Sequence, residues 1–395
     1  MAMKITLFRR IDSLRDELIS LADTIFDHPE LSGHEEKASK WLCDLLTNHG
    51  FQVQKGLGRL PTAFRAEHKL GNGLGPRIGL LCEYDALEKI GHGCGHHMQG
   101  PAICGAAIAL KNTCTFNGTI IVYGTPAEEK GGGKITMLED GFLKDIDVAL
   151  MMHGSPATCV DVKSMANASF QVIYHGISAH AALKPEAGRS ALDALLLAFQ
   201  GMEFLREHVP EDTRMHYTIS ELPGPSNVVP DRAVGSFSLR SYNTSLLENI
   251  LIPRFQRLVQ GAAMMTDTSC ECTLQRTLKG KIPAIKLNEL MMENARLVNA
   301  PNIQPPRQKT GSSDFGNLMY TLPGCCIRVA FVPDGTPSHS ATFVEKGKSK
   351  EAHNAIIYGA KIVAGTAWDL LKDPDKLEAI WEEFKENKKA QENAK

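Results

Sequence analysis

Residues 78–97 read IGLLCEYDALEKIGHGCGHH, a short apolar run that leads into a loop rich in acidic, cysteine and histidine side chains. Two further apolar runs, TIIVYG at 119–124 and DVALMM at 147–152, also end in polar loops, and helix-compatible stretches separate the runs. Strands that alternate with helices predict an α/β fold with a mostly parallel sheet flanked by helices. In such a sheet ligands bind beyond the carboxyl ends of the strands, so we expect the chemistry in these loops.

The middle of the chain predicts a different arrangement. Its segments follow the order strand, helix, strand, strand, helix, strand over residues 169–176, 189–208, 215–220, 233–241, 246–265 and 270–276. This order is typical of a ferredoxin-like α+β domain, in which two helices pack on a small antiparallel sheet. The parallel pattern resumes with CIRVAFV at 326–332. We therefore predict a discontinuous first domain of residues 1–163 and 281–395, interrupted by a second domain at 164–280.

The composition of the 395-residue chain is that of a soluble globular protein, with 43% hydrophobic residues, 22% charged residues and a formal net charge of -2. This balance implies no nucleic-acid and no membrane partner. The N-terminal residues 1–26 predict an amphipathic helix and lack the apolar run and cleavage site of a signal peptide. We therefore expect a cytoplasmic protein whose ten scattered cysteines are mostly reduced.

The densest chemical cluster lies directly after the strand and loop that contain Glu83 and Asp85. Here Cys94 and His96 are separated by one glycine, and glycines on both sides of Cys94 permit a tight backbone path. Thiolate and imidazole groups both suit a zinc-like ion. Taken alone, the cluster is equally compatible with buried core residues.

Two adjacent carboxylates, Glu128 and Glu129, follow the strand at 119–124 in the turn TPAEEKGGG. Like charges this close repel each other unless a cation lies between them. A metal centre would explain the pair, with one carboxylate as a ligand and its neighbour as the acceptor of a proton from the attacking water. The alternative is a solvated acidic turn before a glycine linker.

Two histidines complete the pattern. His153 follows the run at 147–152, and His339 follows the run at 326–332 after two prolines. Four strand ends thus supply a set of candidate ligands with Glu128 beside them: Cys94, His96, Glu129, His153 and His339.

In this order and spacing the residues resemble the aminoacylase and carboxypeptidase group of co-catalytic metallopeptidases (the M20 peptidases), and within it the amidohydrolase branch. The resemblance covers nearly the whole chain. It rests on the segments HPELSGHEE (28–36), EYDALEKIGHGCGHH (83–97), TPAEEKGGG (125–133), MMHGSP (151–156), HGISAHAALKPEAGRSALDAL (175–195), GPSNVVPDRA (224–233), GSSDFG (311–316) and PSHSATF (337–343).

The resemblance implies a zinc-exopeptidase-like catalytic domain in which the five candidate ligands hold two divalent ions. A thiolate ligand favours zinc, whereas a mixed carboxylate and imidazole site also accepts manganese or cobalt. Glu128 would act as general base and acid. Asp85 would orient a ligand through a hydrogen bond, the support that a metal-bound histidine usually receives; the alternative for Asp85 is a turn-forming residue.

The resemblance also implies that the domain at 164–280 is a lid and dimerisation domain. His180 resembles the histidine that enters a partner subunit's active site and polarises the scissile carbonyl, which implies a homodimer; the alternative is an ordinary loop histidine. Asn227 and Arg240 resemble residues that bind the substrate, although Arg240 could equally form a surface salt bridge. Asp314 would line the pocket or cap the helix that it begins.

Three positions depart from the branch pattern. His97 and Glu83 stand where aspartates are usual, and Glu88 stands where proline is common. The form CEYDAL, together with the C-terminal segment 352–384, is more similar to the subgroup of aminobenzoyl-glutamate hydrolases and β-alanyl-lysine dipeptidases. These departures bear on the substrate and leave open whether His97 changes the metal shell.

The predicted function is metal-dependent hydrolysis of the amide bond in an N-acyl amino acid, an aminobenzoyl-glutamate-like conjugate or a small dipeptide. A non-catalytic binding or regulatory protein on the same scaffold is the alternative, and it would require a broken metal shell or a missing base. A dinucleotide-dependent oxidoreductase would need the glycine run at 71–75 to open a helix. Pro76 and a strand follow that run instead.

Overall fold

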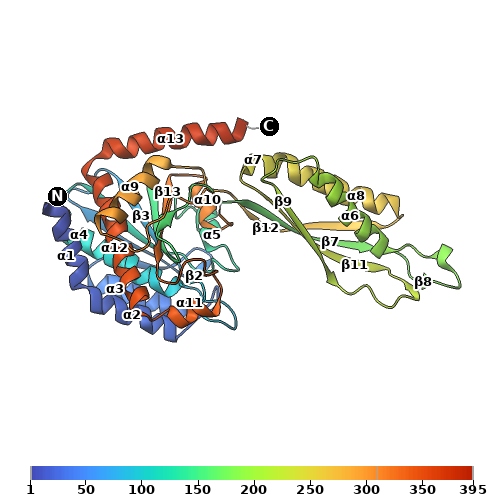
Figure 1. Cartoon of the computed structure of the whole chain (residues 1–395), viewed down its shortest axis with the longest axis horizontal. Helices are drawn as coiled ribbons and strands as arrows, with labels where there is room; N and C mark the ends of the chain where they lie inside the picture. Colours follow the sequence, from blue (N-terminus) through green and yellow to red (C-terminus); the bar gives the residue numbers. More distant parts are fainter. Residues whose placement is uncertain (1, 309, 394–395) are drawn as a thin grey trace. The chain divides into compact units, whose positions relative to one another are not determined.

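The computed structural model describes residues 2–308 and 310–393 (Figure 1). Contacts between residues divide the chain into two compact units. The first unit comprises the residues up to Lys163 together with Lys281–Lys388, and the second comprises Ser164–Gly280 together with the residues from Lys389 onward. The residues from Lys389 onward thus group with the second unit rather than with the first.

The first unit is built on a seven-stranded sheet in the order β1-β2-β4-β3-β5-β13-β6. Its four neighbouring strands β4, β3, β5 and β13 run parallel. Their bounds are Gly118–Gly124, Arg77–Cys82, Val148–Ser155 and Gly324–Ala330. These strands are largely buried and read as continuous apolar runs, as expected for a parallel sheet with both faces covered. The predicted α/β fold with a mostly parallel sheet is therefore confirmed.

The edges of this sheet are antiparallel. β1 (Gln52–Leu57) and β2 (Leu60–Leu70) form a hairpin that pairs with β4, and β6 (Cys159–Val160) pairs with β13. The sequence-based strands do not include this hairpin. Its segments alternate charged and small residues, which gives a weak strand signal.

Helices cover the sheet of the first unit (Figure 1). Helix α4 is apolar on every side, and its residues Gln99–Leu110 are buried, as expected for a helix in the centre of a core. An added side chain at Gly105 would collide with Leu18, so this helix depends on close packing. The helices of this unit are α1 (Ala2–Ser13), α2 (Arg15–Asp27), α3 (Glu36–Asn48), η1 (His96–Met98), α4 (Gln99–Thr113), α5 (Gly133–Glu139), α9 (Ile285–Leu297), α10 (Phe315–Met319), α11 (Ala341–Lys346), α12 (Lys350–Lys372) and α13 (Pro374–Asn393).

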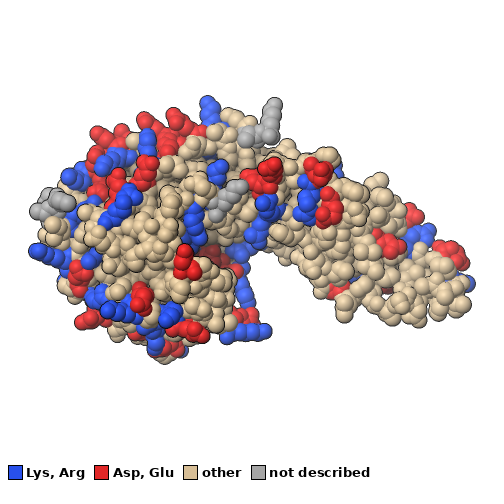
Figure 2. Space-filling view, in the orientation of Figure 1, with Lys and Arg blue, Asp and Glu red and all other residues tan. Residues whose placement is uncertain are grey.

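No helix in the described ranges is long and apolar enough to span a bilayer. On the face drawn in Figure 2, basic and acidic side chains are interspersed over the first unit, in keeping with the net charge of -2.

The second unit contains a four-stranded antiparallel sheet in the order β12-β7-β11-β9. Two helical segments lie between its strands, so the order strand, helix, strand, strand, helix, strand agrees with the sequence-based prediction. A small hairpin of β8 (Ala179–His180) and β10 (Val228–Val229) is separate from this sheet. The remaining elements are β7 (Ala166–His175), η2 (Pro185–Ala187), α6 (Ala191–Arg206), β9 (Arg214–Glu221), β11 (Arg232–Ser241), α7 (Thr244–Leu246), η3 (Leu247–Leu251), α8 (Ile252–Met265) and β12 (Ser269–Leu278).

An aromatic cluster forms the core of the second unit. Phe170 on β7 and Phe237 on β11 each place their ring centroid 5.0 Å from that of Phe255 on α8. All three side chains are buried, so the cluster ties the sheet to its helices.

Phe170→Ala should lower the free energy of unfolding of the second unit by about 3–5 kcal/mol, because the truncated side chain leaves a cavity. Urea unfolding followed by circular dichroism would measure the change. Leu274→Ala is the control, since Leu274 is 49% exposed and should change stability by less than about 0.5 kcal/mol. Equal effects of the two substitutions would contradict this assignment of the core.

Candidate metal centre

The loops expected to carry chemistry leave the sheet at the carboxyl ends of its parallel strands. Cys94 and His96 lie beyond β3, and Glu129 lies beyond β4. His153 is close to the end of β5, and His339 lies beyond β13. Because parallel strands all end at the same edge, residues far apart in the sequence approach one another here.

The five predicted ligands fall into overlapping groups. Ligand atoms lie within 4.8 Å of one another in the group of Cys94, His96 and His153, and likewise in the group of Cys94, Glu129 and His339. The Cys94 thiol is 3.6 Å from Nε2 of His153, and Nε2 of His339 is 3.5 Å from Oε1 of Glu129. The shared thiol gives the arrangement of two adjacent cation sites.

The chemistry of these donors fits divalent ions. Nε2 of His96 and Oε1 of Glu129 are buried, and neither makes a hydrogen bond to any residue that the structure describes. Buried polar atoms in native proteins almost always have a partner, so such atoms call for one. Imidazole, carboxylate and thiol groups are the usual ligands of zinc and related ions.

Asp85 connects two of the predicted ligands. Its Oδ1 lies 3.1 Å from Nδ1 of His96, and its Oδ2 accepts the backbone N–H of Glu129 at 3.0 Å and the Ser32 hydroxyl at 2.7 Å. Burial opposes ionisation of Asp85, yet the hydrogen bond and charge of His96 hold its pKa below the ordinary value. These contacts fit the predicted orienting role and fix the Nδ1 side of the His96 ring.

A buried carboxylate that the sequence does not single out shapes the turn before Glu128. Glu35 is fully buried, and its carboxylate accepts the N–H of Ala127 at 2.8 Å and the hydroxyl of Thr62 at 2.9 Å. Ala127 has φ 60°, a left-handed conformation that costs free energy in a residue with a Cβ. An added side chain at Gly133 would collide with the backbone of Pro126. The turn is therefore held by specific contacts.

Glu128 lies among buried charges. Its pKa is raised to about 8 by burial and by the negative charges of Glu83 and Asp314, while Lys134 and His96 oppose the shift. Oxygens of Glu83, Glu128 and Asp314 lie within 4.8 Å of one another. Lys134 is fully buried and forms salt bridges to Glu83 and Asp314. The lysine itself gives no sequence signal, because its partners are distant in the chain.

The sequence predicts that Asp314 lines the substrate pocket or caps a helix. The structure buries it completely, and its side chain makes no capping hydrogen bond to α10. Its carboxylate instead accepts hydrogen bonds from the backbone N–H and the ammonium group of Lys134. These contacts favour a role inside the protein over a substrate contact.

His97 points away from the predicted ligands. Its Nε2 is 2.8 Å from the carbonyl oxygen of Gly347, and its ring packs edge-on against Phe26 with centroids 4.8 Å apart. Burial lowers the pKa of His97 to about 4. His97 belongs to none of the ligand groups found among the described residues, so this departure from the family pattern alters the packing behind the centre.

Three predicted residues lie in the second unit. His180 is exposed on β8, where its Nδ1 accepts the backbone N–H of Ala182. Asn227 is also exposed, directly before β10, and its carbonyl accepts the N–H of Ala181. Arg240 is half-buried on β11, opposite Asn167. The small hairpin therefore brings His180 and Asn227 close together, whereas Arg240 lies on the main sheet.

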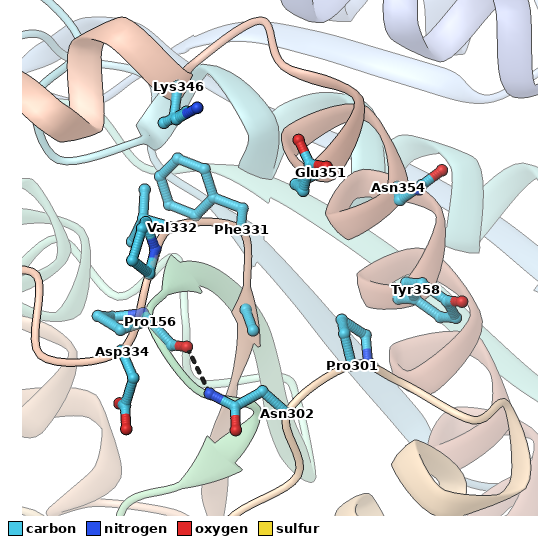
Figure 3. A pocket seen from close by; sticks show the side chains of 12 residues that line it. Pro156, Pro301, Asn302, Phe331, Val332, Asp334, Lys346, Glu351, Asn354 and Tyr358 are labelled. Atoms are coloured by element: carbon cyan, nitrogen blue, oxygen red, sulfur yellow. Dashed lines mark hydrogen bonds between the residues drawn. The ribbon is translucent and has the colours of Figure 1, made fainter.

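A cavity of about 540 Å³ in the first unit lies beside β13 (Figure 3). Its wall includes Phe331, Val332 and Tyr358, and a hydrogen bond of 2.9 Å from Asn302 to the Pro156 carbonyl crosses one side. The described residues that line it include none of the predicted ligands. The cavity is therefore separate from the metal centre.

The sheet topology and the donor cluster together define the class of protein. A mostly parallel α/β unit that collects thiol, imidazole and carboxylate groups at the carboxyl edge of its strands, beside a buried glutamate, is typical of a metallohydrolase.

Comparison with known proteins identifies the family. Residues 79–366 match the model of peptidase family M20/M25/M40. One chain of the p-aminobenzoyl-glutamate hydrolase of Escherichia coli (strain K12) is 30% identical over 95% of this chain and 93% of its own length. The Xaa-Arg dipeptidase of Homo sapiens is 31% identical over 95% of this chain and 90% of its own. The chain belongs to peptidase family M20/M25/M40 and is a metal-dependent amidohydrolase.

A solved structure supports the same fold. A Bacillus subtilis protein described as a dinuclear metal binding peptidase from the M20 family superposes with a TM-score of 0.70 and 20% sequence identity, covering 91% of this chain and 99% of that one. The resemblance to the M20 peptidases, the fold class and the assignment as a metallo-amidohydrolase are thus confirmed.

Asp85→Asn should weaken metal affinity by about 10- to 100-fold, because the hydrogen bond that orients His96 would be lost or reversed. Titration of metal-free protein with Zn²⁺ in a competing chelator would measure the change. Glu88→Gln is the control, since the Glu88 side chain is exposed and pairs with the exposed Lys130. Unchanged affinity in Asp85→Asn would contradict the orienting role.

Proposed function

We propose that this chain hydrolyses the amide bond of an N-acyl amino acid, an aminobenzoyl-glutamate-like conjugate or a small dipeptide. The proposed ligands of two divalent ions are Cys94, His96, Glu129, His153 and His339. The observation that carries the proposal is the pair of ligand groups sharing Cys94, with Glu128 beside them. The names of the two curated relatives, an aminobenzoyl-glutamate hydrolase and an Xaa-Arg dipeptidase, support this substrate class.

The proposed cofactor is a pair of zinc ions, with manganese or cobalt as alternatives. The Cys94 thiol supports zinc, whereas the surrounding carboxylate and imidazole groups suit all three metals. When bound, two such ions would lower the pKa of a water molecule and stabilise the negative charge that develops on the amide oxygen.

The chain's own residues supply proton transfer and orientation. Glu128 would accept a proton from the attacking water and return it to the leaving amine, which is otherwise a poor leaving group. Asp85 would hold the His96 ring and the backbone of Glu129 in place through its hydrogen bonds. His180, Asn227 and Arg240 are the proposed substrate contacts from the second unit.

The alternative of a non-catalytic binding protein on this scaffold is less well supported. Such a protein would be expected to lack a ligand or the base, whereas all five predicted ligands and Glu128 are present and fall into groups of suitable geometry.

We further propose a homodimer formed through the second unit. β9 is an edge strand of its sheet, and an exposed edge offers unpaired backbone groups to a second chain. Apolar side chains are exposed on or beside this strand: Ile219 is 42% exposed, Leu222 is 95% exposed and Phe204 on α6 is 67% exposed. A second copy that pairs along β9 would cover them.

The proposed location is the cytoplasm. All ten cysteines are free thiols, as expected for a reducing compartment.

Glu128→Gln should lower kcat by about 10²–10⁴-fold with little change in metal content, because the general base is lost while the ligands remain. The parent, reconstituted with Zn²⁺ or Mn²⁺, would first be assayed on N-acyl amino acids, p-aminobenzoyl-glutamate and dipeptides, and should hydrolyse at least one of them. Activity of Glu128→Gln within about tenfold of the parent would rule out the assigned base.

Introducing a charge at the exposed edge, as in Ile219→Lys with Leu222→Asp, should convert the dimer to a monomer, because buried charges and lost apolar contact oppose pairing along β9. Light scattering after size-exclusion chromatography would give the mass. Leu74→Asp, at a position in the first unit that is 71% exposed, is the control. A parent that is already monomeric would contradict the proposal.

A further inference from the structure

Lys134, the second residue of α5, is enclosed by acidic groups. Its side chain has no solvent exposure, and its ammonium nitrogen lies 2.5 Å from Oε1 of Glu83 and 2.7 Å from Oδ1 of Asp314. Asp314 also accepts the backbone N–H of Lys134 at 3.1 Å. A lysine is almost never fully buried unless it is paired, so these contacts hold the ammonium in one place.

The carboxylates around Lys134 have the geometry of a cation site. Oxygens of Glu83, Glu128 and Asp314 meet the same 4.8 Å limit as the proposed ligand groups. The ammonium of Lys134 contacts two of these three side chains directly. Three carboxylates this close would strongly repel one another without a positive charge. In this group, therefore, a lysine supplies the positive charge that an ion would otherwise provide.

The lysine cluster is one contact away from the metal centre. Oε2 of Glu83 lies 3.3 Å from Nε2 of His96 and accepts a hydrogen bond from Gln99 at 2.8 Å. Glu83 thus touches Lys134 with one oxygen and the ring of His96 with the other. The member shared with the proposed chemistry is Glu128, whose neighbour Glu129 is a proposed ligand.

We propose that Lys134 is a positioning residue that occupies the third acidic group as an internal cation and keeps Glu128 outside metal coordination. Glu83 and Asp314 are held against the ammonium, so the group takes up no metal ion, and the Glu128 carboxylate is left to accept a proton. This inference rests on the proposed function of Glu128 as the base. It differs from a purely structural role, in which Lys134 would only offset buried charge.

Neutral substitution of Lys134 separates the two roles. Metal-free parent, Lys134→Met, Lys134→Gln and Lys134→Arg would each be titrated with Mn²⁺, and bound metal would be measured by mass spectrometry together with kcat and KM. We expect the parent and Lys134→Arg to saturate at two ions per chain. Both neutral variants should bind one further ion and lose about 100-fold in kcat with KM within about threefold of the parent.

Lys281→Met is the matched control. Lys281 is also buried in the first unit, where it donates to the Asp161 carbonyl and to Asn288. This substitution should lower the melting temperature without changing the number of Mn²⁺ ions bound. An additional ion in Lys281→Met as well would mean that loss of any buried lysine has this effect, and would overturn the proposal.

Other results also decide the matter. A neutral variant with the metal content and kcat of the parent would overturn the role of Lys134, even though the parent's own uptake and turnover would leave the proposed function intact. If neither neutral variant folds, the parent in excess Mn²⁺ is decisive, because saturation at two ions supports the proposal and a third bound ion contradicts it. A parent that binds no Mn²⁺ would instead refute the proposed function.

Discussion

The common direction of four neighbouring strands is the constraint on which the candidate site depends. β4, β3, β5 and β13 run parallel, so the loops after them leave the same edge of the sheet. Thiol, imidazole and carboxylate groups from separate parts of the chain meet there without any long connecting loop. The same sheet is covered on both faces, which removes most of the site from water and strengthens each electrostatic contact within it.

Burying so many ionisable groups requires that each have a specific partner, since an unpaired buried charge costs several kcal/mol (roughly 3–5 when one partner is removed). The structure meets this requirement through shared carboxylates. Asp85 serves His96 and the backbone of Glu129, and Glu35 serves the strained residue Ala127. Because each carboxylate contacts more than one element, the turn that carries Glu128 cannot move independently of the sheet.

The central strands and the candidate ligands were predictable from the sequence because their signals are local. Buried parallel strands read as apolar runs, and donor residues follow them within a few positions. The hairpin of β1 and β2 lacks that signal, since LPTAFRAEHKL alternates in character. Lys134 was not predictable, because its partner Asp314 is 180 positions away and a lysine in a glycine-rich turn reads as exposed. Glu35 is hidden in the same way by its distance from Ala127.

The departures from the amidohydrolase pattern lie around the proposed ligands rather than among them. His97 is turned toward Phe26 and Gly347, so it changes the wall behind the centre. Glu83 is longer by one methylene than the aspartate usual at this position, and it contacts both Lys134 and the ring of His96. An aspartate on the same backbone would have a shorter reach and could not easily span both groups. Glu83 and Lys134 therefore form a matched pair, and together they set the charges that surround Glu128.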